Sequence, residues 1–273
     1  MRLARRCGAG IALAGLIVAG LGACGGGDDD DSSSDTTERD RDETTETSAA
    51  EDIDVQAFCD GFTAVDKAFF ELPDDPEALR AFVEANITPH IEPTIANAPP
   101  ELAEDVRVML DALDEALANT DFSGFGSPDF VAAQSAVYPE LADTCGLGSL
   151  DGIAIDYGFQ GIPATLPAGT TIVTLNNQSS GGEFHELTIA RINDGVTDTV
   201  EQILAMSDTD AAARVVLGAS ASAEVGEIGG ATIDLVPGRY LYACFVPMGS
   251  VGAQEGTGDP HYTAGMFGEF TVT

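Results

Sequence analysis

The sequence predicts two folded domains, an all-α domain over residues 53–147 and an all-β sandwich or barrel over residues 148–273. Before Gly148, apolar residues recur at spacings of three and four, which is the pattern of buried helix faces. After Gly148, short stretches rich in β-branched and aromatic residues alternate with turn signals, which favours an antiparallel β domain. Residues 1–52 differ from both in composition, because an apolar leader is followed there by an acidic stretch.

Residues 1–23 have the pattern of a secretory signal peptide. A basic start, MRLARRC, precedes an apolar run that is too short to span a membrane comfortably. The run ends in LGAC, which resembles a bacterial lipobox, and cleavage there would leave Cys24 as a lipid-modified amino terminus. A transmembrane anchor is the alternative, although glycine-rich helices of this length span membranes poorly. The sequence therefore predicts an extracytoplasmic protein that is lipid-anchored to a bacterial membrane, at the cell surface or in the periplasm.

Residues 24–52 are predicted to form an acidic, disordered tether. The segment has almost no apolar side chains and many like charges, so it cannot bury enough surface to fold. Without residues 1–23 the chain has 8 basic and 46 acidic residues, a formal charge of −38. That charge argues strongly against a nucleic-acid partner, and it favours a protein partner with a basic face.

Three helices are predicted in the all-α domain. The first has one apolar face, made by Val55, Phe58, Phe62, Val65 and Phe69. The second repeats this spacing between residues 102 and 117, after a start signal with two prolines. The third begins at Ser127 as the N-cap, followed by a proline, and Pro139 is expected to kink or split it.

Six strands are predicted in the β domain, at residues 151–159, 170–177, 183–192, 231–235, 239–246 and 266–273. One stretch among them, residues 197–217, has a helical pattern and is expected to lie between two strands as an excursion.

The five cysteines can be assigned by elimination. Cys7 leaves with the leader and Cys24 takes the lipid. Cys59 lies in the first predicted helix and Cys145 at the end of the last, and a disulfide between them would stabilise the domain by about 4 kcal/mol in the chain-entropy model. Cys244 is then left single in an oxidising compartment, so it is a free thiol or its sulfur is otherwise occupied.

Strand alternation places His185, Cys244 and Met266 on the apolar faces of their strands, and His261 lies in the loop between the last two strands. Each residue has an ordinary explanation by itself. A buried methionine usually packs in a core, a buried histidine is usually hydrogen-bonded, and a buried cysteine is usually inert. Together, however, two imidazoles, a thiolate and a thioether are the ligand set of a type 1 copper site.

Three stretches of residues 148–273 resemble the cupredoxins, the family that includes plastocyanin and azurin. They are YGFQGIPATLPAGTTIVTLNNQSSGGEFHEL, PGRYLYACFVP and PHYTAGMFGEFTV. The resemblance implies a Greek-key β-sandwich that holds one copper ion in a mononuclear site. His185, Cys244 and His261 would be its strong equatorial ligands and Met266 its weak axial ligand. The implied function is one-electron transfer, so the protein is expected not to be an enzyme.

The sequence departs from the family between Cys244 and His261. Sixteen residues separate the two, where azurin-like members have about four, whereas the spacing from His261 to Met266 fits the family. Two doublings of loop length cost only about 1.2 kcal/mol of closure entropy, compared with roughly 10 kcal/mol from a structural metal site. We therefore expect copper affinity to survive, while the rigidity of a type 1 site depends on how this insertion folds.

Two other functions compete with electron transfer. The first is a copper scavenger or chaperone, which would use the same ligands but exchange its metal readily. The second is a metal-free β-sandwich that binds another component of the cell envelope, in which Cys244 would remain a free thiol. An enzyme with an open copper position ranks third.

The segment beginning at His185, HELTI, lacks the second histidine of a zinc protease, and His90, among prolines, is interpreted as a structural or surface residue.

The predicted lipid anchor has a direct test. Cys24→Ser removes the sulfur that would carry the lipid, so the protein should move from the membrane fraction to the soluble fraction. The measurement is the distribution of the protein between the two fractions after centrifugation. Unchanged retention in the membrane would instead support an uncleaved helix.

Overall fold

The computed structural model describes residues 53–252 and 254–273, which fall within one compact unit. The predicted signal peptide, Cys24 and the acidic tether lie outside the described residues. Within the part that is described, no helix is long and apolar enough to cross a membrane.

The first part of the unit is helical, as the sequence predicts. Its helices are α2 (Val55–Phe69), α3 (Pro76–Asn86), α4 (Thr88–Asn97), α5 (Ala103–Asn119), the 3-10 helix η1 (Ser123–Gly126) and α6 (Pro128–Cys145). Asp54, Asp75 and Ser127 cap α2, α3 and α6 with side-chain oxygens that accept backbone N–H bonds. The sequence did not indicate α3, because this helix buries none of its residues and so lacks an apolar stripe.

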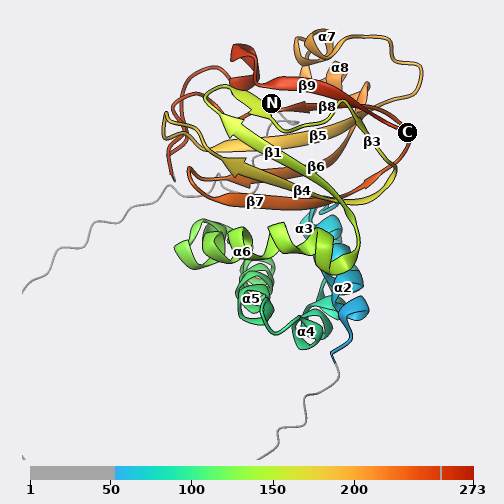
Figure 1. Ribbon diagram of the computed structural model, residues 1–273, viewed down its shortest axis with the longest axis vertical. Helices are drawn as coiled ribbons and strands as arrows, with labels where there is room; N and C mark the ends of the chain where they lie inside the picture. Colours follow the sequence, from blue (N-terminus) through green and yellow to red (C-terminus); the bar gives the residue numbers. More distant parts are fainter. Residues whose placement is uncertain (1–52, 253) are drawn as a thin grey trace, which may run out of the picture. The chain divides into compact units, whose positions relative to one another are not determined.

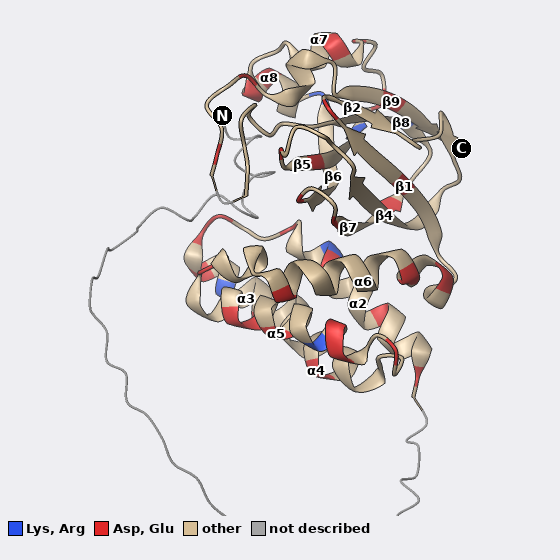
Figure 2. Ribbon diagram, turned by 60° about the vertical axis from the view of Figure 1, so that its left-hand side comes forward, with Lys and Arg blue, Asp and Glu red and all other residues tan. Residues whose placement is uncertain are grey.

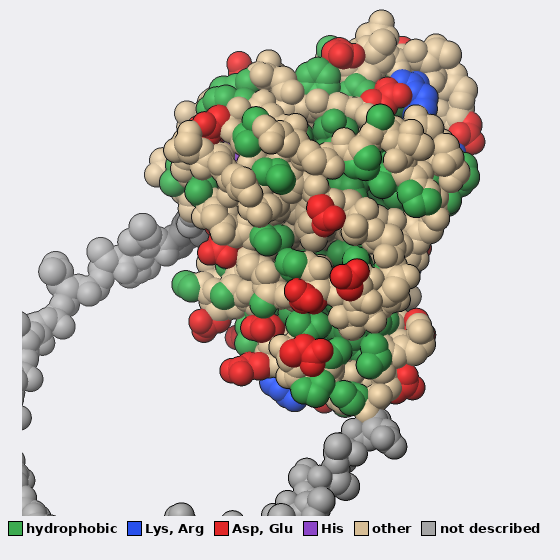
Figure 3. Space-filling model, viewed as in Figure 1, with side chains coloured by type: hydrophobic (Ala, Val, Ile, Leu, Met, Phe, Trp, Pro, Cys, Tyr) green, Lys and Arg blue, Asp and Glu red, His purple; other side chains and the backbone are tan. Residues whose placement is uncertain are grey.

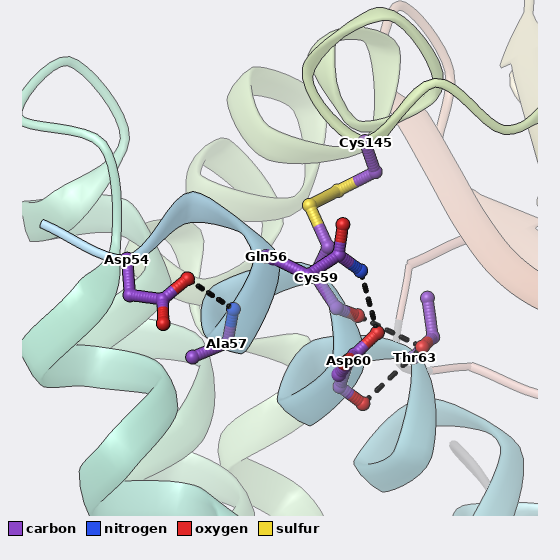
Figure 4. Close-up of a disulfide and its surroundings, with 7 residues drawn as sticks. All are labelled: Asp54, Gln56, Ala57, Cys59, Asp60, Thr63 and Cys145. Atoms are coloured by element: carbon purple, nitrogen blue, oxygen red, sulfur yellow. Dashed lines mark hydrogen bonds between the residues drawn. A yellow bond between two sulfur atoms is a disulfide. The ribbon is translucent and has the colours of Figure 1, made fainter.

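Two sequence predictions concern α6. A disulfide joins Cys145, at the end of this helix, to Cys59 in α2, with the Cα atoms 5.6 Å apart (Figure 4). The predicted pairing is therefore confirmed, and Cys244 is the free cysteine of the described residues. Pro139 was expected to kink or split the helix, and α6 continues through this residue without a split.

The second part is a β-sandwich of two sheets (Figure 1). One sheet has the strand order β2-β1-β4-β7 and the other β3-β9-β8-β5-β6. The strands are β1 (Gly148–Ile155), β2 (Gly158–Gln160), β3 (Thr165–Leu166), β4 (Gly169–Asn177), β5 (His185–Ile192), β6 (Val215–Ala223), β7 (Ile228–Leu235), β8 (Gly238–Ala243) and β9 (Phe267–Val272). The apolar core lies between the sheets and includes Leu150, Leu175, Leu187, Tyr240 and Phe270.

The sandwich is not fully antiparallel, which corrects the sequence prediction. β1 pairs with β4 in parallel, and β3 pairs with β9 in parallel. The reason is the path of the chain after β1, which contributes β2 to the first sheet and β3 to the second before β4 returns beside β1. The predicted strand at 151–159 is accordingly broken at Asp156 and Tyr157, between β1 and β2.

The predicted helical excursion is present as α7 (Val200–Leu204) and α8 (Asp208–Ala212), between β5 and β6. They cover a small core on the outer side of β5 and β8. β6 was missed, because its sequence after the first three residues, GASASA, is poor in β-branched and aromatic side chains.

The helices pack against the outer face of the β4–β7 sheet. Ile172 of β4 belongs to the helical core, and Lys67 of α2 forms an ion pair with Asp234 of β7 at 3.0 Å. Ser135 of α6 forms hydrogen bonds at the start of β7, donating to Glu227, the residue before the strand, at 2.8 Å and accepting from the Ile228 N–H at 2.9 Å. The helical part thus covers one sheet and contributes to the same folded unit.

Gly230 provides a test of this packing. A Cβ atom added there would overlap the ring of Tyr138 in α6, which cannot bend away. Gly230→Ala should therefore lower the free energy of unfolding by about 1–3 kcal/mol, as measured by urea denaturation. Gly124→Ala is the matched control, because nothing lies within 4 Å of its added Cβ. Equal stability of the two variants would contradict the packing described here.

Candidate metal centre

Four residues predicted as ligands lie at ends of elements in the β-sandwich. His185 is the first residue of β5, and Cys244 directly follows β8. His261 begins the 3-10 helix η2 (His261–Ala264), and Met266 directly precedes β9. All four are buried, with exposed fractions of 1% for His185 and 0% for the other three. The strand alternation seen in the sequence thus predicted the inward orientation of His185, Cys244 and Met266 correctly.

His185, Cys244 and His261 form one cluster, in which the candidate ligand atoms all lie within 4.8 Å of one another. The two Nδ1 atoms are 3.0 Å apart, and the Cys244 Sγ lies 3.4 Å from Nδ1 of His261 and 3.9 Å from Nδ1 of His185. Nitrogen and sulfur ligands lie about 2.0 and 2.3 Å from a zinc ion, so three of them spaced evenly in a plane around one such ion are about 3.5–3.7 Å apart. The observed spacing therefore fits a single ion of this size.

Met266 is held beside this cluster by its backbone. Its N–H donates to the carbonyl of His261 at 3.3 Å, and its carbonyl accepts from the N–H of Cys244 at 3.0 Å. Its side chain belongs to the same buried core as that of Cys244. The thioether is therefore placed in the apolar surroundings of the thiol.

Comparisons with known proteins were made for the whole chain. No protein-family model matches it, and no curated protein matches it. Among solved structures, auracyanin B matches at 26% identity over 46% of this chain and 88% of its own, with a TM-score of 0.31. Auracyanin A, a "blue" copper protein from Chloroflexus aurantiacus, matches at 19% over 46% of this chain and all of its own (100%), with a TM-score of 0.28.

Multicopper oxidases match as well. One from Pediococcus acidilactici is 14% identical over 46% of this chain and 26% of its own, with a TM-score of 0.27. The assignment of the C-terminal region depends on two features of this chain itself. These are the two-sheet sandwich and the His–Cys–His cluster between its strands, both expected from the resemblance to cupredoxins. The C-terminal region is a cupredoxin-like domain.

The long insertion of the cupredoxin-like domain is closed at its base by backbone hydrogen bonds. The N–H of Tyr262 donates to the carbonyl of Cys244 at 2.9 Å, and the N–H of His261 donates to that of Val246 at 2.9 Å. One step further out, the N–H of Met248 donates to the carbonyl of Asp259 at 3.0 Å. Cys244 and His261 are therefore neighbours across paired backbone, and the extra residues extend beyond that pairing.

Glu186 supports the thiol of Cys244. Its backbone N–H donates to the Cys244 Sγ at 3.4 Å, and its carboxylate accepts from the N–H of Phe245 at 3.0 Å. The side chain is buried, and burial raises the pKa of Glu186 to about 7, against the lowering effect of hydrogen bonds from the N–H of Phe245 and the side chain of Thr188. Sequence reasoning considered this residue only as part of a failed zinc-protease pattern.

Glu183 contacts the imidazole of His261 from the other side. Its Oε2 lies 2.6 Å from Nε2 of His261, and its Oε1 accepts from the hydroxyl of Tyr157 at 3.0 Å. Burial opposes ionisation of Glu183, but hydrogen bonds from Gly249 N–H, Tyr157 and His261 outweigh it and keep its pKa below the usual value. Sequence reasoning missed Glu183 and Tyr157, because their contacts join segments far apart in the chain.

The three clustered groups are neutral in the metal-free protein. Burial, and after it repulsion from a charged His261, lower the pKa of His185 to about 4. Burial also lowers the pKa of His261, although Glu183 opposes this, and burial raises the pKa of the Cys244 thiol. Neutral imidazoles have a free nitrogen lone pair for a metal, whereas the thiol must release its proton when a metal binds.

This electrostatic state predicts an unreactive thiol. In the protein with Cys7→Ser and Cys24→Ser, Cys244 is the single cysteine outside the disulfide. Because the Cys244 thiol is buried and protonated, its reaction with a thiol-specific chromogenic disulfide should be many times slower in the folded protein than in the same protein in denaturant. The absorbance of the released thiolate measures this rate. Rapid reaction of the folded, metal-free protein would contradict the burial of Cys244.

Proposed function

We propose that this protein is an extracytoplasmic, lipid-anchored copper protein that transfers single electrons through a type 1-like site. The observation that supports this best is the convergence of His185, Cys244 and His261 from three separate segments, with both Nδ1 atoms next to the sulfur. In this proposal the three are equatorial ligands of one copper ion, and Met266 is the weak axial ligand.

The donor set supports copper over zinc. Structural zinc sites are tetrahedral with four strong nitrogen or sulfur ligands from the protein, whereas here the fourth candidate is a thioether. Two imidazoles and a thiolate with a distant thioether are the set that blue-copper sites use. Because the three strong donors converge on one place, the proposal includes one ion only.

The surroundings of the cluster support a carrier rather than an enzyme. Copper bound here would supply one-electron redox chemistry, and the chain's part is to hold the ligands still and exclude water. The backbone pairing between residues 244–248 and 259–262 holds the ligands still, and the burial of all four side chains excludes water. A substrate would need an open coordination position, which side chains buried to this degree do not offer.

The acidic surface supports a basic protein partner, either a redox protein or a copper donor. Asp and Glu are spread over the helices and over loops of the sandwich, with Lys and Arg at a few places (Figure 2). Figure 3 shows the same imbalance on one face, where apolar side chains are scattered in small groups among acidic ones. Association with such a partner should weaken as salt is added, since exposed charges are screened.

The proposed location is supported by two features. The LGAC sequence at Cys24 is consistent with lipid attachment, and the disulfide between Cys59 and Cys145 is of the kind that persists in oxidising compartments. Membrane attachment in this proposal comes from the lipid alone.

Spectroscopy of the copper-loaded protein tests the proposal. In the Cys7→Ser, Cys24→Ser background, copper should produce an intense visible thiolate-to-copper band, and Cys244→Ser should abolish it because the band needs the sulfur. Met266→Leu should retain the ion and shift the reduction potential, since leucine nearly replaces the volume of a weak axial ligand. His261→Ala should open a position that added imidazole fills, which would restore the band.

Two results would contradict the proposal. Absence of the thiolate band in the copper-loaded parent protein would exclude a type 1-like site. A band that vanishes within seconds when a copper chelator is added would instead favour the scavenger or chaperone function, because a carrier must retain its ion.

A further inference from the structure

Glu183 is the meeting point of three segments around the candidate metal centre. Its carboxylate accepts from Nε2–H of His261, from the hydroxyl of Tyr157 in the turn between β1 and β2, and from the N–H of Gly249 in the insertion. Only 16% of its side chain is exposed, and its Oε2 lies 2.6 Å from Nε2 of the fully buried His261. The Glu183 carboxylate is therefore part of the immediate surroundings of the candidate metal centre and not a solvent-exposed surface charge.

The backbone on both sides of Glu183 is held in place. Its carbonyl accepts from the side-chain amide of Asn177 at 2.9 Å and from the hydroxyl of Ser179 at 3.3 Å. The next N–H, that of Phe184, donates to the carbonyl of Ser250 in the insertion at 3.0 Å. The insertion therefore contacts Glu183 through Gly249 and its neighbour through Ser250, so it takes part in fixing the carboxylate.

Tyr157 is held over His261 in a backbone conformation that costs energy. Its φ of 54° lies in the left-handed region, which for a non-glycine residue costs about 1–2 kcal/mol. Asp156 holds this turn by accepting from the N–H groups of Ser180 and Gly181 at 2.8 and 2.9 Å. The result is that the Tyr157 ring stands edge-on to the imidazole of His261, with 5.2 Å between the centroids. At 37% exposure, Tyr157 separates that imidazole from solvent.

We propose that Glu183 is a positioning residue for the metal centre, and that Tyr157 and the insertion hold and cover it. The proposal deepens the copper function described above and rests on it. Because Nε2–H of His261 donates to the carboxylate, the free lone pair of the imidazole is on Nδ1, the atom that lies 3.4 Å from the Cys244 sulfur. The insertion thus has a role at the site, since the N–H of Gly249 is a donor that orients Glu183.

The proposal makes Glu183 a determinant of the reduction potential. An anion at the outer edge of the imidazole makes the ring a better donor, and a better donor favours the more highly charged Cu(II) over Cu(I). Glu183→Gln keeps the size of the side chain and removes the charge. It should lower the preference for Cu(II) about tenfold, which is a rise of about 59 mV in a one-electron potential.

The experiment uses the full chain in the Cys7→Ser, Cys24→Ser background and compares Glu183→Gln, Glu183→Ala and a control, Glu255→Gln. Glu255 is exposed in the same insertion, so the control removes an equal charge without touching His261.

In the metal-free proteins, nitrogen NMR of the imidazoles should show His261 protonated on Nε2 in the parent and control. Glu183→Ala should give a mixture of both tautomers, and its Cu(II) affinity should fall about 10–100-fold.

A separate variant tests whether Tyr157 covers His261. Tyr157→Gly removes the ring and suits the positive φ, so the fold is retained. Added imidazole should then change the visible spectrum of the copper-loaded variant while leaving that of the parent protein unchanged. No response of the variant would overturn the covering role of Tyr157.

The results separate this inference from the proposed function. If the parent protein shows the thiolate band but Glu183→Gln and Glu183→Ala match Glu255→Gln in potential and tautomer, the role of Glu183 is overturned. If the parent protein shows no band, the copper function fails, while the tautomer of His261 in the metal-free protein still decides whether Glu183 positions it.

Discussion

The candidate metal centre depends on backbone pairing between the segments that carry Cys244 and His261. Residues 244–248 and 259–262 are joined by hydrogen bonds in register, so the distance between thiol and imidazole is set by peptide geometry and not by the loop between them. β8 and β9 are neighbours in one sheet, and β5 lies on the other side of β8. Because His185 begins β5, the same sheet delivers the second imidazole to the same end of the sandwich. Each ligand position therefore follows from strand register.

The chemistry of the centre comes from burying polar groups that have few protein partners. Nε2 of His185 is buried without a hydrogen-bond partner among the described residues, and the Cys244 sulfur accepts a long hydrogen bond of 3.4 Å from the N–H of Glu186 and another from the N–H of Val246. Burying a polar group without its full set of hydrogen bonds costs free energy. A bound metal ion would coordinate the facing Nδ1 atoms and the sulfur, and would thereby satisfy these three buried polar atoms although not Nε2 of His185. The cluster is thus arranged better for an ion than for the metal-free fold.

The sequence predicted what depends on local pattern and simple counting. Alternation along the strands placed His185, Cys244 and Met266 inward, and the cysteine count indicated the disulfide between Cys59 and Cys145. What it missed depends on tertiary contacts. Glu183 sits in a glycine- and serine-rich turn with no motif around it, and only the folded chain brings Tyr157 and His261 to it. The parallel pairing of β1 with β4 was missed too, because alternation gives the face of a strand but not the direction of its neighbour.

The pairing at the base of the insertion also divides that loop into two parts with different freedom to vary. The part up to Gly252 is bound to the rest of the domain through Gly249, the carbonyl of Ser250 and the N–H of Gly252, which donates to Glu224. Val251 and Gln254 pair with each other across a short hairpin-like turn, and Gln254 and Glu255 are exposed. A protein engineer could therefore insert a recognition peptide at Gln254 and Glu255, on the side of the loop that does not hold Glu183.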